Sequence, residues 1–463
     1  MSDTISLVIL AAGEGKRLKL NCPKALAPMA GRKLVDFPVG AALGFLSEGN
    51  IEGNITLVLG HGATEVKNYI NSKYDDVNTV FQENQLGTAD AVNSYLKSVD
   101  IKDDKSDYTF VMCADTPMIG EEDLTRLYNI IKSKELDALA ATFLAKDPFG
   151  YGRIVLSKQG FHIVEEKDAN EETKEIQEVN SGLYVFKSCF LRKEIKKISN
   201  KNQSGEFYLT DIFEEDKNVK TECFENEEIF YGVNDLQQLQ QSERFIRWEH
   251  MGKLRDEGVR LIDLSHTYID LDVEIGVGTC IYPNVFLEGK TKIGADCLIE
   301  AGSIIRNSVL HDSVNIKAYS HLEDVIVRSH ASIGPFGRLR PGTDIGAESK
   351  IGNFVEIKKS KLEKGVKVSH LSYVGDAEIG EESNIGCGFV TCNYDGKNKH
   401  KTEIGKNCFI GSNSQTVAPV EIGNDCFVAS GSTINQPMED GSFAISRGRQ
   451  VTKPGLAKKF IKK

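Results

Sequence analysis

Aliphatic side chains recur every six residues through the second half of the chain. Many of them are followed by glycine, as in Ile275-Gly276 and Ile351-Gly352. A hexapeptide period of this length predicts a parallel β-helix, in which each coil has three short flat sides and the aliphatic side chains point into the core. The repeating positions fall in three phases, namely Ile275, Ile281, Leu287, Ile293, Ile299 and Ile305, then Ile333, Leu339, Ile345, Ile351 and Ile357, then Ile404, Ile410, Ile422, Val428 and Ile434.

The segment TCNYDGKNKHKT interrupts the six-residue period. The spacing from Ile385 to Ile404 is three hexads and one extra residue. We therefore expect a loop to leave the coil between them. Loops carried by a rigid scaffold are where functional sites are often built, so this loop is a candidate site.

The first half of the chain shows a different pattern, in which short apolar runs alternate with helix-like stretches. This alternation is typical of an α/β domain with a mostly parallel sheet. Strands are predicted over residues 5–10, 55–60, 108–115 and 138–144. Apolar residues at helical spacing then predict a helix that ends before Gly258. We expect three parts: a Rossmann-like α/β domain (1–234), a linker helix (235–257) and a left-handed parallel β-helix with a basic C-terminal tail (258–463).

Composition narrows the possible functions. The formal net charge of -11 argues against nucleic acid as a partner, because phosphate backbones are bound by basic surfaces. No apolar stretch is long enough to cross a membrane, and the first residues lack the features of a secretory signal, so a cytoplasmic protein is expected. The ten cysteines are scattered and form no C-x-x-C pair, which predicts neither a zinc site nor disulfides.

The first predicted strand runs into a glycine turn, Ala11-Ala12-Gly13-Glu14-Gly15-Lys16-Arg17. A glycine turn that opens a helix presents backbone N–H groups to an anion and can cradle a triphosphate. Alone this is weak, because strand, turn and helix recur in many α/β proteins. Lys24 follows one short loop later, and Asp115 ends an apolar strand, where α/β sheets bind ligands. A carboxylate at that place suits Mg²⁺.

These residues belong to a longer set of motifs that resembles the sugar-1-phosphate nucleotidyltransferases. The set comprises LAAGEGKR, Pro23-Lys24, QLGTA (85–89), ADTP (114–117), GYGR (150–153), VEEKDA (164–169), QEVNSGLY (177–184), GEFYLTD (205–211) and GVN (232–234). It looks most like the uridylyltransferase half of a bifunctional family that makes UDP-N-acetylglucosamine. Relatives often carry an aromatic residue where this chain has Cys113.

The resemblance implies roles for individual residues of the first domain. Asp115 and Asn234 would hold Mg²⁺, and Lys24 would act in uridylyl transfer. The residues that would bind UTP or the UDP-sugar product are Leu10, Ala11, Ala12, Gly13, Arg17, Lys24, Gln82, Gly87, Thr88, Cys113, Asp115, Gly152, Glu165, Asn180 and Asn234. Among them Gln82, Gly87 and Thr88 would recognise uracil, and Gly152, Glu165 and Asn180 the sugar.

On the β-helix, spacing alone points to one group of residues. Arg340 and Lys358 are three hexads apart, which places them on the same side of successive coils, where both side chains can reach one phosphate. His370 follows Lys358 by two hexads, another multiple of six, so we expect all three in register. A lone histidine is more often a bystander than a functional group.

The β-helix motifs IGPFGRLRPG, IGNFVEIKKS, HLSYVGDAEIG, NIGCGFVTCNYDGKNKHKT, IGSNSQTVAPV and ISR (445–447) resemble the acetyltransferase half of the same bifunctional family. The resemblance makes His370 the proton acceptor in acetyl transfer to glucosamine 1-phosphate. Glu356 could orient its neighbours. The sugar-phosphate contacts would be Arg340, Lys358, Tyr373, Asn384 and Lys399, and the acetyl-CoA contacts Cys387, Asn393, Tyr394, Ser412, Ser430 and Arg447.

Two other interpretations stay open. The β-helix could be only structural or regulatory, as in ADP-glucose pyrophosphorylases, although a structural coil would not need His370 and Lys358. Some translation-factor exchange subunits pair the same folds without catalysis, but such a scaffold would be expected to lose Lys24, Asp115 or Asn234. The resemblance further implies a homotrimer and a product that supplies cell-envelope polymers, including peptidoglycan and lipopolysaccharide.

Overall fold

The structure of the chain is a computed structural model that describes residues 3–98, 106–158, 160–214 and 217–461. It divides into two compact units, the first ending at Ile246 and the second beginning at Arg247. The boundary falls inside helix α7 (Leu236–Asp256), the helix predicted over residues 235–257.

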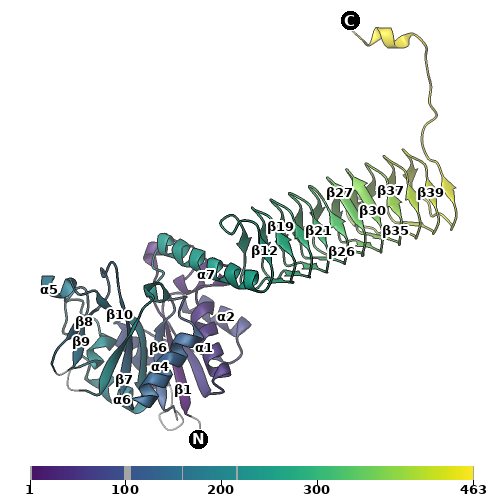
Figure 1. The fold of residues 1–463 in the computed structure, drawn as a ribbon. Coiled ribbons are helices and arrows are strands. Elements are labelled where there is room, and N and C mark those ends of the chain that lie inside the picture. The colour runs from purple at the N-terminus through teal and green to yellow at the C-terminus, as the bar shows by residue number, and fades with distance from the viewer. Residues whose placement is uncertain (1–2, 99–105, 159, 215–216, 462–463) are drawn as a thin grey trace. The chain divides into compact units, whose positions relative to one another are not determined.

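The first unit is an α/β domain around a nine-stranded sheet (Figure 1). The strand order is β11-β7-β10-β6-β1-β4-β5, with β8 paired to β10 and β9 to β8. Strand β1 is parallel to β4 and β6, and only β10 and the β8–β9 pair introduce antiparallel pairing. The strands are β1 (Thr4–Ala11), β4 (Glu52–Leu59), β5 (Val77–Phe81), β6 (Tyr108–Cys113), β7 (Ala138–Leu144), β8 (Arg153–Leu156), β9 (Phe161–Val164), β10 (Glu178–Lys187) and β11 (Val219–Phe224).

Short helices and a hairpin complete this unit. The α-helices are α1 (Asp36–Glu48), α2 (Ala63–Lys73), α3 (Thr88–Ser98), α4 (Glu121–Ser133), α5 (Glu171–Lys174) and α6 (Ser188–Glu194). The single-turn 3-10 helices are η1 (Lys16–Leu18), η2 (Lys24–Leu26), η3 (Ile195–Lys197), η4 (Leu209–Ile212) and η5 (Glu227–Phe230), and the hairpin is β2 (Pro28–Met29) with β3 (Arg32–Lys33).

All four predicted strands are present in the sheet. They read as continuous apolar runs because both sheet faces are covered: Ile5, Leu7 and Ile9 of β1 pack into one core cluster, whereas Val8 packs into the other. The prediction of a helix after the glycine turn is wrong. Only η1 forms there, because Gly15 (φ 66°) and Lys19 (φ 52°) on either side of it are both left-handed.

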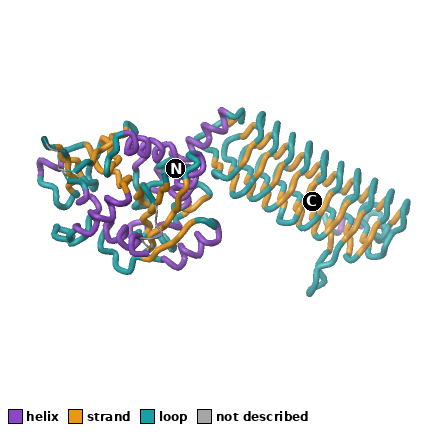
Figure 2. Tube along the Cα trace, turned by 90° about the horizontal axis from the view of Figure 1, so that it is seen from below, coloured by secondary structure: helices purple, strands orange, loops and turns teal. Residues whose placement is uncertain are grey.

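The second unit is a left-handed parallel β-helix, as predicted. Its coils stack regularly (Figure 2), and each contributes one strand to each of three sheets, which we call faces 1, 2 and 3 in the order the chain visits them. Face 1 consists of β12 (Arg260–Leu261), β15 (Cys280–Ile281), β18 (Leu298–Ile299), β21 (Asn315–Ile316), β24 (Ser332–Ile333), β27 (Lys350–Asn353), β30 (Lys367–His370), β33 (Asn384–Ile385), β36 (Phe409–Ile410), β39 (Phe427–Val428) and β41 (Phe443–Ala444).

The other two faces follow the same rule. Face 2 consists of β13 (Tyr268–Ile269), β16 (Phe286–Glu288), β19 (Ile304–Arg306), β22 (His321–Glu323), β25 (Arg338–Leu339), β28 (Glu356–Lys358), β31 (Tyr373–Gly375), β34 (Val390–Cys392), β37 (Gln415–Val417) and β40 (Thr433–Ile434). Face 3 consists of β14 (Glu274–Ile275), β17 (Lys292–Ile293), β20 (Val309–Leu310), β23 (Val325–Val327), β26 (Thr343–Ile345), β29 (Lys361–Leu362), β32 (Ala377–Ile379), β35 (Thr402–Ile404) and β38 (Val420–Ile422). A 3-10 turn, η6 (Leu456–Lys459), lies in the tail.

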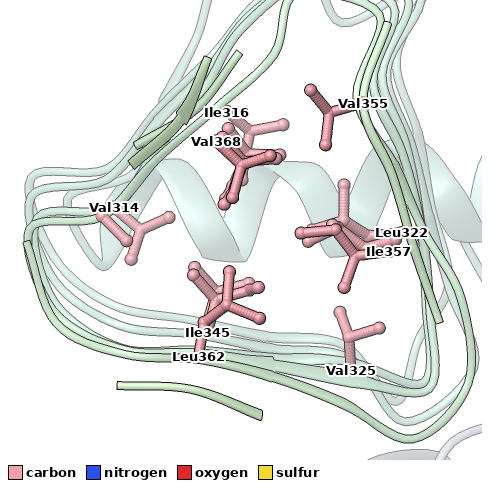
Figure 3. Packing of buried hydrophobic residues seen from close by; sticks show 14 of the residues in the cluster. Val314, Ile316, Leu322, Val325, Ile345, Val355, Ile357, Leu362 and Val368 are labelled. Carbon is pink, nitrogen blue, oxygen red and sulfur yellow. The ribbon is translucent and has the colours of Figure 1, made fainter. Parts of the chain in front are cut away.

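The core of the β-helix is built mainly from aliphatic side chains that the strands turn inward; Thr391 of β34 and Thr416 of β37 are the buried exceptions among the described strands. Figure 3 shows the aliphatic side chains gathered in three columns, with Ile316 and Val368 from face 1, Leu322 and Ile357 from face 2, and Ile345 with Leu362 from face 3. Nearly all of the aliphatic positions that define the six-residue period are buried. Most coils span three hexads, as between Ser332 and Lys350, or one residue fewer, as between Leu298 and Asn315, and the shorter coils cause the change of phase after Ile305.

Two further sequence-based expectations are confirmed. The coil from Asn384 to Phe409 is longer than three hexads by one further hexad and one residue, because a loop between β34 and β35 leaves it at the predicted place. All ten cysteines are free. Among the described residues, no helix is long and apolar enough to cross a membrane.

A core substitution measures how much the inward columns stabilise the β-helix. Ile357→Ala should lower the free energy of unfolding by about 2–5 kcal/mol, since Ile357 is fully buried and its loss leaves a cavity. Ile326→Ala is the matched control: this isoleucine points outward between the buried Val325 and Val327 and should change stability by less than about 1 kcal/mol. Denaturant unfolding monitored by circular dichroism compares the two, and equal losses would contradict the assignment of inward and outward positions.

Candidate active sites

The first candidate site lies at the carboxyl ends of β1 and β6. Leu10 pairs with Cys113 across these strands, and the amide of Ala114 donates to the carbonyl of Leu10 at 2.9 Å. This pairing brings Asp115 beside the glycine turn. A cavity of about 40 Å³ there is lined by Leu10, Ala11, Gly13, Lys24, Ala25, Leu34, Ala114 and Asp115.

Three residues distant in sequence meet at this cavity. The Lys24 ammonium donates to a carboxylate oxygen of Asp115 and, at 2.9 Å, to the amide oxygen of Asn234. The amide of Val233 donates to the carbonyl of Asp115 at 2.8 Å, and the amide of Asn234 donates to Gln238 at the start of α7. The two oxygen-bearing segments are therefore fixed against each other.

Asp115 and Asn234 fit a magnesium ion. A carboxylate and an amide oxygen are hard ligands, and Mg²⁺ in phosphate-transfer sites takes one or two protein oxygens and fills its octahedron with phosphate and water. Within the described part of the chain, no group of three or more His, Cys, Asp or Glu side chains could hold a metal by itself. Any ion bound here would therefore share its ligands with a substrate.

Residues expected to recognise uracil lie between the end of β5 and the first residue of α3, which is Thr88. Gln82 is buried, and its side-chain amide donates to Asp90 at 2.8 Å, which orients it. Gly87 has φ +121°, and a Cβ there would lie 2.5 Å from the carbonyl oxygen of Phe207. The Thr88 hydroxyl accepts from the amide of Leu209 at 3.0 Å. The loop is thus pinned to the segment that carries Phe207.

Residues expected to contact the sugar also come together. The amide of Asn180 donates to the carbonyl of Gly152 at 2.8 Å, and a Cβ on Gly152 would lie 3.4 Å from the Glu165 carboxylate. The Thr210 hydroxyl donates to Glu165 at 2.9 Å, but burial outweighs this bond and raises the pKa of Glu165. The three predicted residues therefore form one polar wall.

Cys113 lies between the Asp115 end of the site and this wall. Its Sγ would be 3.6 Å from a Cβ placed on Gly182, two residues after Asn180. Burial, reinforced by the Asp115 charge, raises the pKa of Cys113 to about 12. The thiol is therefore neutral at physiological pH and is no nucleophile. Ala12 is half-buried, and Arg17 is exposed on η1.

The second candidate site is on face 2 of the β-helix. Arg340 precedes Lys358 by one coil, and its backbone amide donates to the carbonyl of Ile357. Arg340 also forms an ion pair of 2.7 Å with Glu356. Lys399 lies so close to Lys358 that its ammonium lowers the pKa of Lys358. Arg340, Lys358 and Lys399 thus form a cluster of cations in which Glu356 pairs with Arg340 and the Asp376 carboxylate acts on Lys358; the excess of positive charge suits a phosphate group.

His370 is not in register with these cations, so that prediction is wrong. It ends β30 on face 1, at the corner where the chain turns toward face 2. A coil is three hexads long, so residues three hexads apart lie on the same face. Residues two hexads apart, such as Lys358 and His370, lie on different faces. Tyr373 does lie on face 2, beside Glu356.

The corner between faces 1 and 2 carries a continuous column of predicted acetyl-CoA residues. The amide of Gly388 donates to the carbonyl of His370, that of Asn413 to Cys387, and that of Gly431 to Ser412. The Arg447 guanidinium then donates to the carbonyl of Ser430 at 2.8 Å. With strands about 4.8 Å apart, the column from His370 to Ser430 is roughly 14 Å long.

Asn384 is separated from the other sugar-phosphate residues. It lies on face 1 in the same outward row as Phe409, whereas Arg340, Lys358 and Tyr373 lie on face 2. Within one chain the flat sides of the coil diverge from their shared corner. Within one chain Asn384 and the face 2 cations therefore lie on different sides of the coil.

The loop at residues 393–401 folds back on itself beside face 2. Asn393 is buried and donates to Asp376 at 2.6 Å, and Tyr394 bridges to Lys399. Asp395 accepts from the backbone amides of residues 397 and 398 and pairs with His400 at 2.7 Å, which holds its pKa well below the usual range. The loop places Lys399 next to Lys358, at the edge of a cavity of about 480 Å³.

Two family models and several known proteins match this chain. A nucleotidyl transferase family model matches residues 6–256, and a model of bacterial transferase hexapeptide repeats matches residues 401–436. The chain is 41% identical to the bifunctional protein GlmU of Clostridioides difficile, covering 98% of this chain and 97% of the relative. The GlmU proteins of Staphylococcus haemolyticus and Thermosipho africanus are 41% and 42% identical and cover 98% and 96% of this chain, and 99% and 95% of their own lengths.

The chain belongs to the GlmU family. It is therefore a bifunctional enzyme, with a nucleotidyltransferase unit and an acetyltransferase unit on one chain, and it serves cell-wall synthesis. Family membership covers nearly the whole length, so the β-helix is not a regulatory addition, and the non-catalytic scaffold is excluded as well.

Several positioning residues of this GlmU-family chain were not found from its sequence. Asp90 orients Gln82, and Asp395 ties the loop that carries Lys399. Gly375 lies under the Tyr373 ring: a Cβ there would be 2.4 Å from the Tyr373 hydroxyl and 2.8 Å from the Asn393 amide. The one available signal was the segment SYVGD itself, in which a small residue follows Tyr373 by two positions on the same strand face.

Gly375→Ala tests the packing of Tyr373. The new methyl group should push the Tyr373 hydroxyl and Asn393 aside, raising KM for the amino-sugar phosphate by about tenfold with a smaller change in kcat. Gly252→Ala is the control, because a Cβ there meets nothing within 4 Å. Steady-state acetyl-transfer kinetics compares them, and an unchanged KM for Gly375→Ala would mean that this contact does not position Tyr373 for substrate.

Proposed function

We propose that the chain makes UDP-N-acetylglucosamine by two transfers. The second unit moves an acetyl group from acetyl-CoA to glucosamine 1-phosphate. The first unit then joins the N-acetylglucosamine 1-phosphate product to the uridylyl group of UTP and releases pyrophosphate. Both reactions use small molecules of the cytoplasm, and the product supplies peptidoglycan and lipopolysaccharide.

In acetyl transfer His370 accepts a proton from the 2-amino group of the sugar. The amine nitrogen attacks the thioester carbonyl, the C–S bond breaks, and coenzyme A leaves as its thiol after taking up a proton. Arg340, Lys358 and Lys399 bind the sugar phosphate, and Tyr373 contacts the sugar. Cys387, Asn393, Tyr394, Ser412, Ser430 and Arg447 contact acetyl-CoA.

The observation that carries this proposal is the corner column. His370 lies at one end of it, and Cys387, Ser412, Ser430 and Arg447 follow in successive coils. A thioester has to reach the base while its long pantetheine arm and charged nucleotide extend away from it. A straight column with a guanidinium at the far end suits such a ligand, and a purely structural coil would have no use for it.

In uridylyl transfer the oxygen of the sugar phosphate attacks the α-phosphorus of UTP, and the bond to the β-phosphate breaks. Positioning and charge neutralisation provide most of the acceleration of such a reaction. Leu10, Ala11, Ala12, Gly13 and Arg17 contact the nucleotide, Gln82, Gly87 and Thr88 the uracil, and Gly152, Glu165 and Asn180 the sugar. Asp115 and Asn234 would hold Mg²⁺, which neutralises phosphate charge when bound, and Lys24 contacts the phosphates.

A homotrimer would complete the acetyltransferase site. An apolar ridge, defined by Tyr319, Phe336, Phe354 and Leu371, runs along the corner beside His370, and each of its side chains is 45–61% exposed. All four residues have left-handed backbones with φ between 47° and 57°, which costs about 1 kcal/mol or more for each non-glycine residue. A large exposed apolar side chain at such a position is explained if a second copy covers it. The second copy would also bring its Asn384 to the face 2 cations of the first copy, because Asn384 and these cations lie on different faces within each chain.

Exchanging single residues separates the two activities. His370→Ala should reduce acetyl transfer by roughly 100-fold or more while pyrophosphate release changes by less than about twofold, because a positioned base contributes factors of this size. Asp115→Ala should do the reverse. The exposed His311→Ala serves as the matched control on the β-helix. Free thiol and pyrophosphate are measured separately, and loss of both activities in either folded variant would contradict independent sites.

The apolar ridge can be tested on assembly. Phe336→Asp combined with Phe354→Asp should convert the trimer to a monomer and abolish acetyl transfer, since burying two carboxylates in an apolar contact is strongly unfavourable. Uridylyl transfer should persist. Leu156→Asp, at an exposed leucine of the first unit, is the control. Sedimentation velocity gives the assembly state, and a wild-type monomer with full acetyltransferase activity would refute the shared site.

A further inference from the structure

The Lys24 ammonium lies where two oxygens converge. It donates to the carboxylate of Asp115 and to the amide oxygen of Asn234, and its side chain is only 12% exposed. These are the two oxygens proposed to hold Mg²⁺. Mg²⁺ binds oxygen at about 2.0–2.1 Å, so the ion and the ammonium cannot occupy this point together.

We propose that Lys24 is an internal competitor of the metal ion, which keeps Mg²⁺ out of the site until a nucleotide draws the ammonium away. The inference rests on the proposed function and adds to it the order in which the site is filled. The position of Lys24 supports this inference, because its ammonium bonds to the same two oxygens that would bind the metal ion.

Only the Lys24 side chain has to move for the site to change state. The backbone of Lys24 is fixed in η2, where the amide of Leu26 donates to the carbonyl of Pro23 and that of Ala27 to the carbonyl of Lys24. Gly15 approaches so closely that a Cβ on it would lie 2.7 Å from the Lys24 Cβ. Asp115 and Asn234 are held by their own backbone bonds. The exchange is therefore a rotation of one flexible side chain between fixed partners.

The charges determine what can drive this rotation. A divalent ion alone would have to displace the ammonium and would then leave two positive groups next to each other, which repel. A triphosphate provides a new anionic partner for Lys24 and, at the same time, further oxygens for the metal. Metal and nucleotide should therefore bind together more strongly than either does alone, which is a positive coupling between the two ligands.

The test measures binding of Mn²⁺ alone, without nucleotide, to the full chain. Mn²⁺ prefers the same oxygen ligands and its free form is quantified by electron paramagnetic resonance. Lys24→Met removes the ammonium and retains the side-chain length. Lys16→Met is the matched control, since it removes the same charge from a nearby residue that is 76% exposed and pairs with Glu14 instead of Asp115. The double variant Lys24→Met with Asp115→Asn shows whether any gained site is the one at Asp115.

Lys24→Met should bind one Mn²⁺ about tenfold more tightly than the wild type, because the competing charge is gone. Lys16→Met should stay within about twofold of the wild type, and the double variant should lose the gained site. Equal or weaker Mn²⁺ binding by Lys24→Met would overturn the inference, as would a gain that survives Asp115→Asn. Lys24→Gln repeats the comparison if thermal unfolding shows that the methionine variant is misfolded.

This result is separable from the proposed function. Absence of pyrophosphate release by the wild type, given both substrates and Mg²⁺, would overturn uridylyl transfer without affecting the Mn²⁺ comparison. Unchanged Mn²⁺ affinity in Lys24→Met, with normal wild-type activity, would overturn only the competition by Lys24.

Discussion

The second unit depends on one constraint, which is that nearly every strand of every coil must turn an aliphatic side chain inward, with buried threonines taking that place at Thr391 and Thr416. The three inward columns bury their side chains almost completely, and each coil can align with the next only if its strands keep the same register. Side chains that point outward then line up in straight rows along each face and in columns along each corner, and the sequence needs no other feature to align them. The line from His370 to Arg447 exists because the core fixes the coils beneath it. The arrangement that we propose for acetyl transfer is thus a consequence of core packing alone.

The first unit positions its groups in another way. Parallel strands buried on both faces end together at one edge of the sheet, where Leu10, Cys113 and Asp115 meet. Lys24 and Asn234 reach the same point from loops, and the Lys24 ammonium between the two side-chain oxygens holds the edge closed. The small volume beside them agrees with a site that must rearrange to accept a triphosphate. The two sites therefore differ. The β-helix presents a preformed surface, whereas the site of the first unit is closed by the ion pair between Lys24 and Asp115.

Much of this could be read from the sequence, for reasons that particular residues make plain. The period through Ile333, Leu339 and Ile345 predicted the β-helix because burial alone produces it, and the extra length near Asn393 predicted the loop. What failed was the side to which His370 points, since a multiple of six does not distinguish three faces. The helix after Gly13 also failed, because left-handed residues at positions 15 and 19 limit it to one turn. Asp90, Gly375 and Asp395 act through contacts between distant segments or through tight packing, which no local pattern reveals.

Helix α7 contributes to the core of both units. Leu239, near its start, packs among residues of the first unit, whereas Met251 and Leu254 are part of the buried core of the β-helix. Arg247 donates to the carbonyl of Ile269 and pairs with Asp270 in the second unit. A stack of coils has open ends, at which strand edges and aliphatic columns would meet water or another stack. The last turns of α7 plug one of them. A truncated protein that begins at residue 258, where the repeats begin, would therefore have a β-helix with one uncovered end. Such molecules would tend to associate end to end.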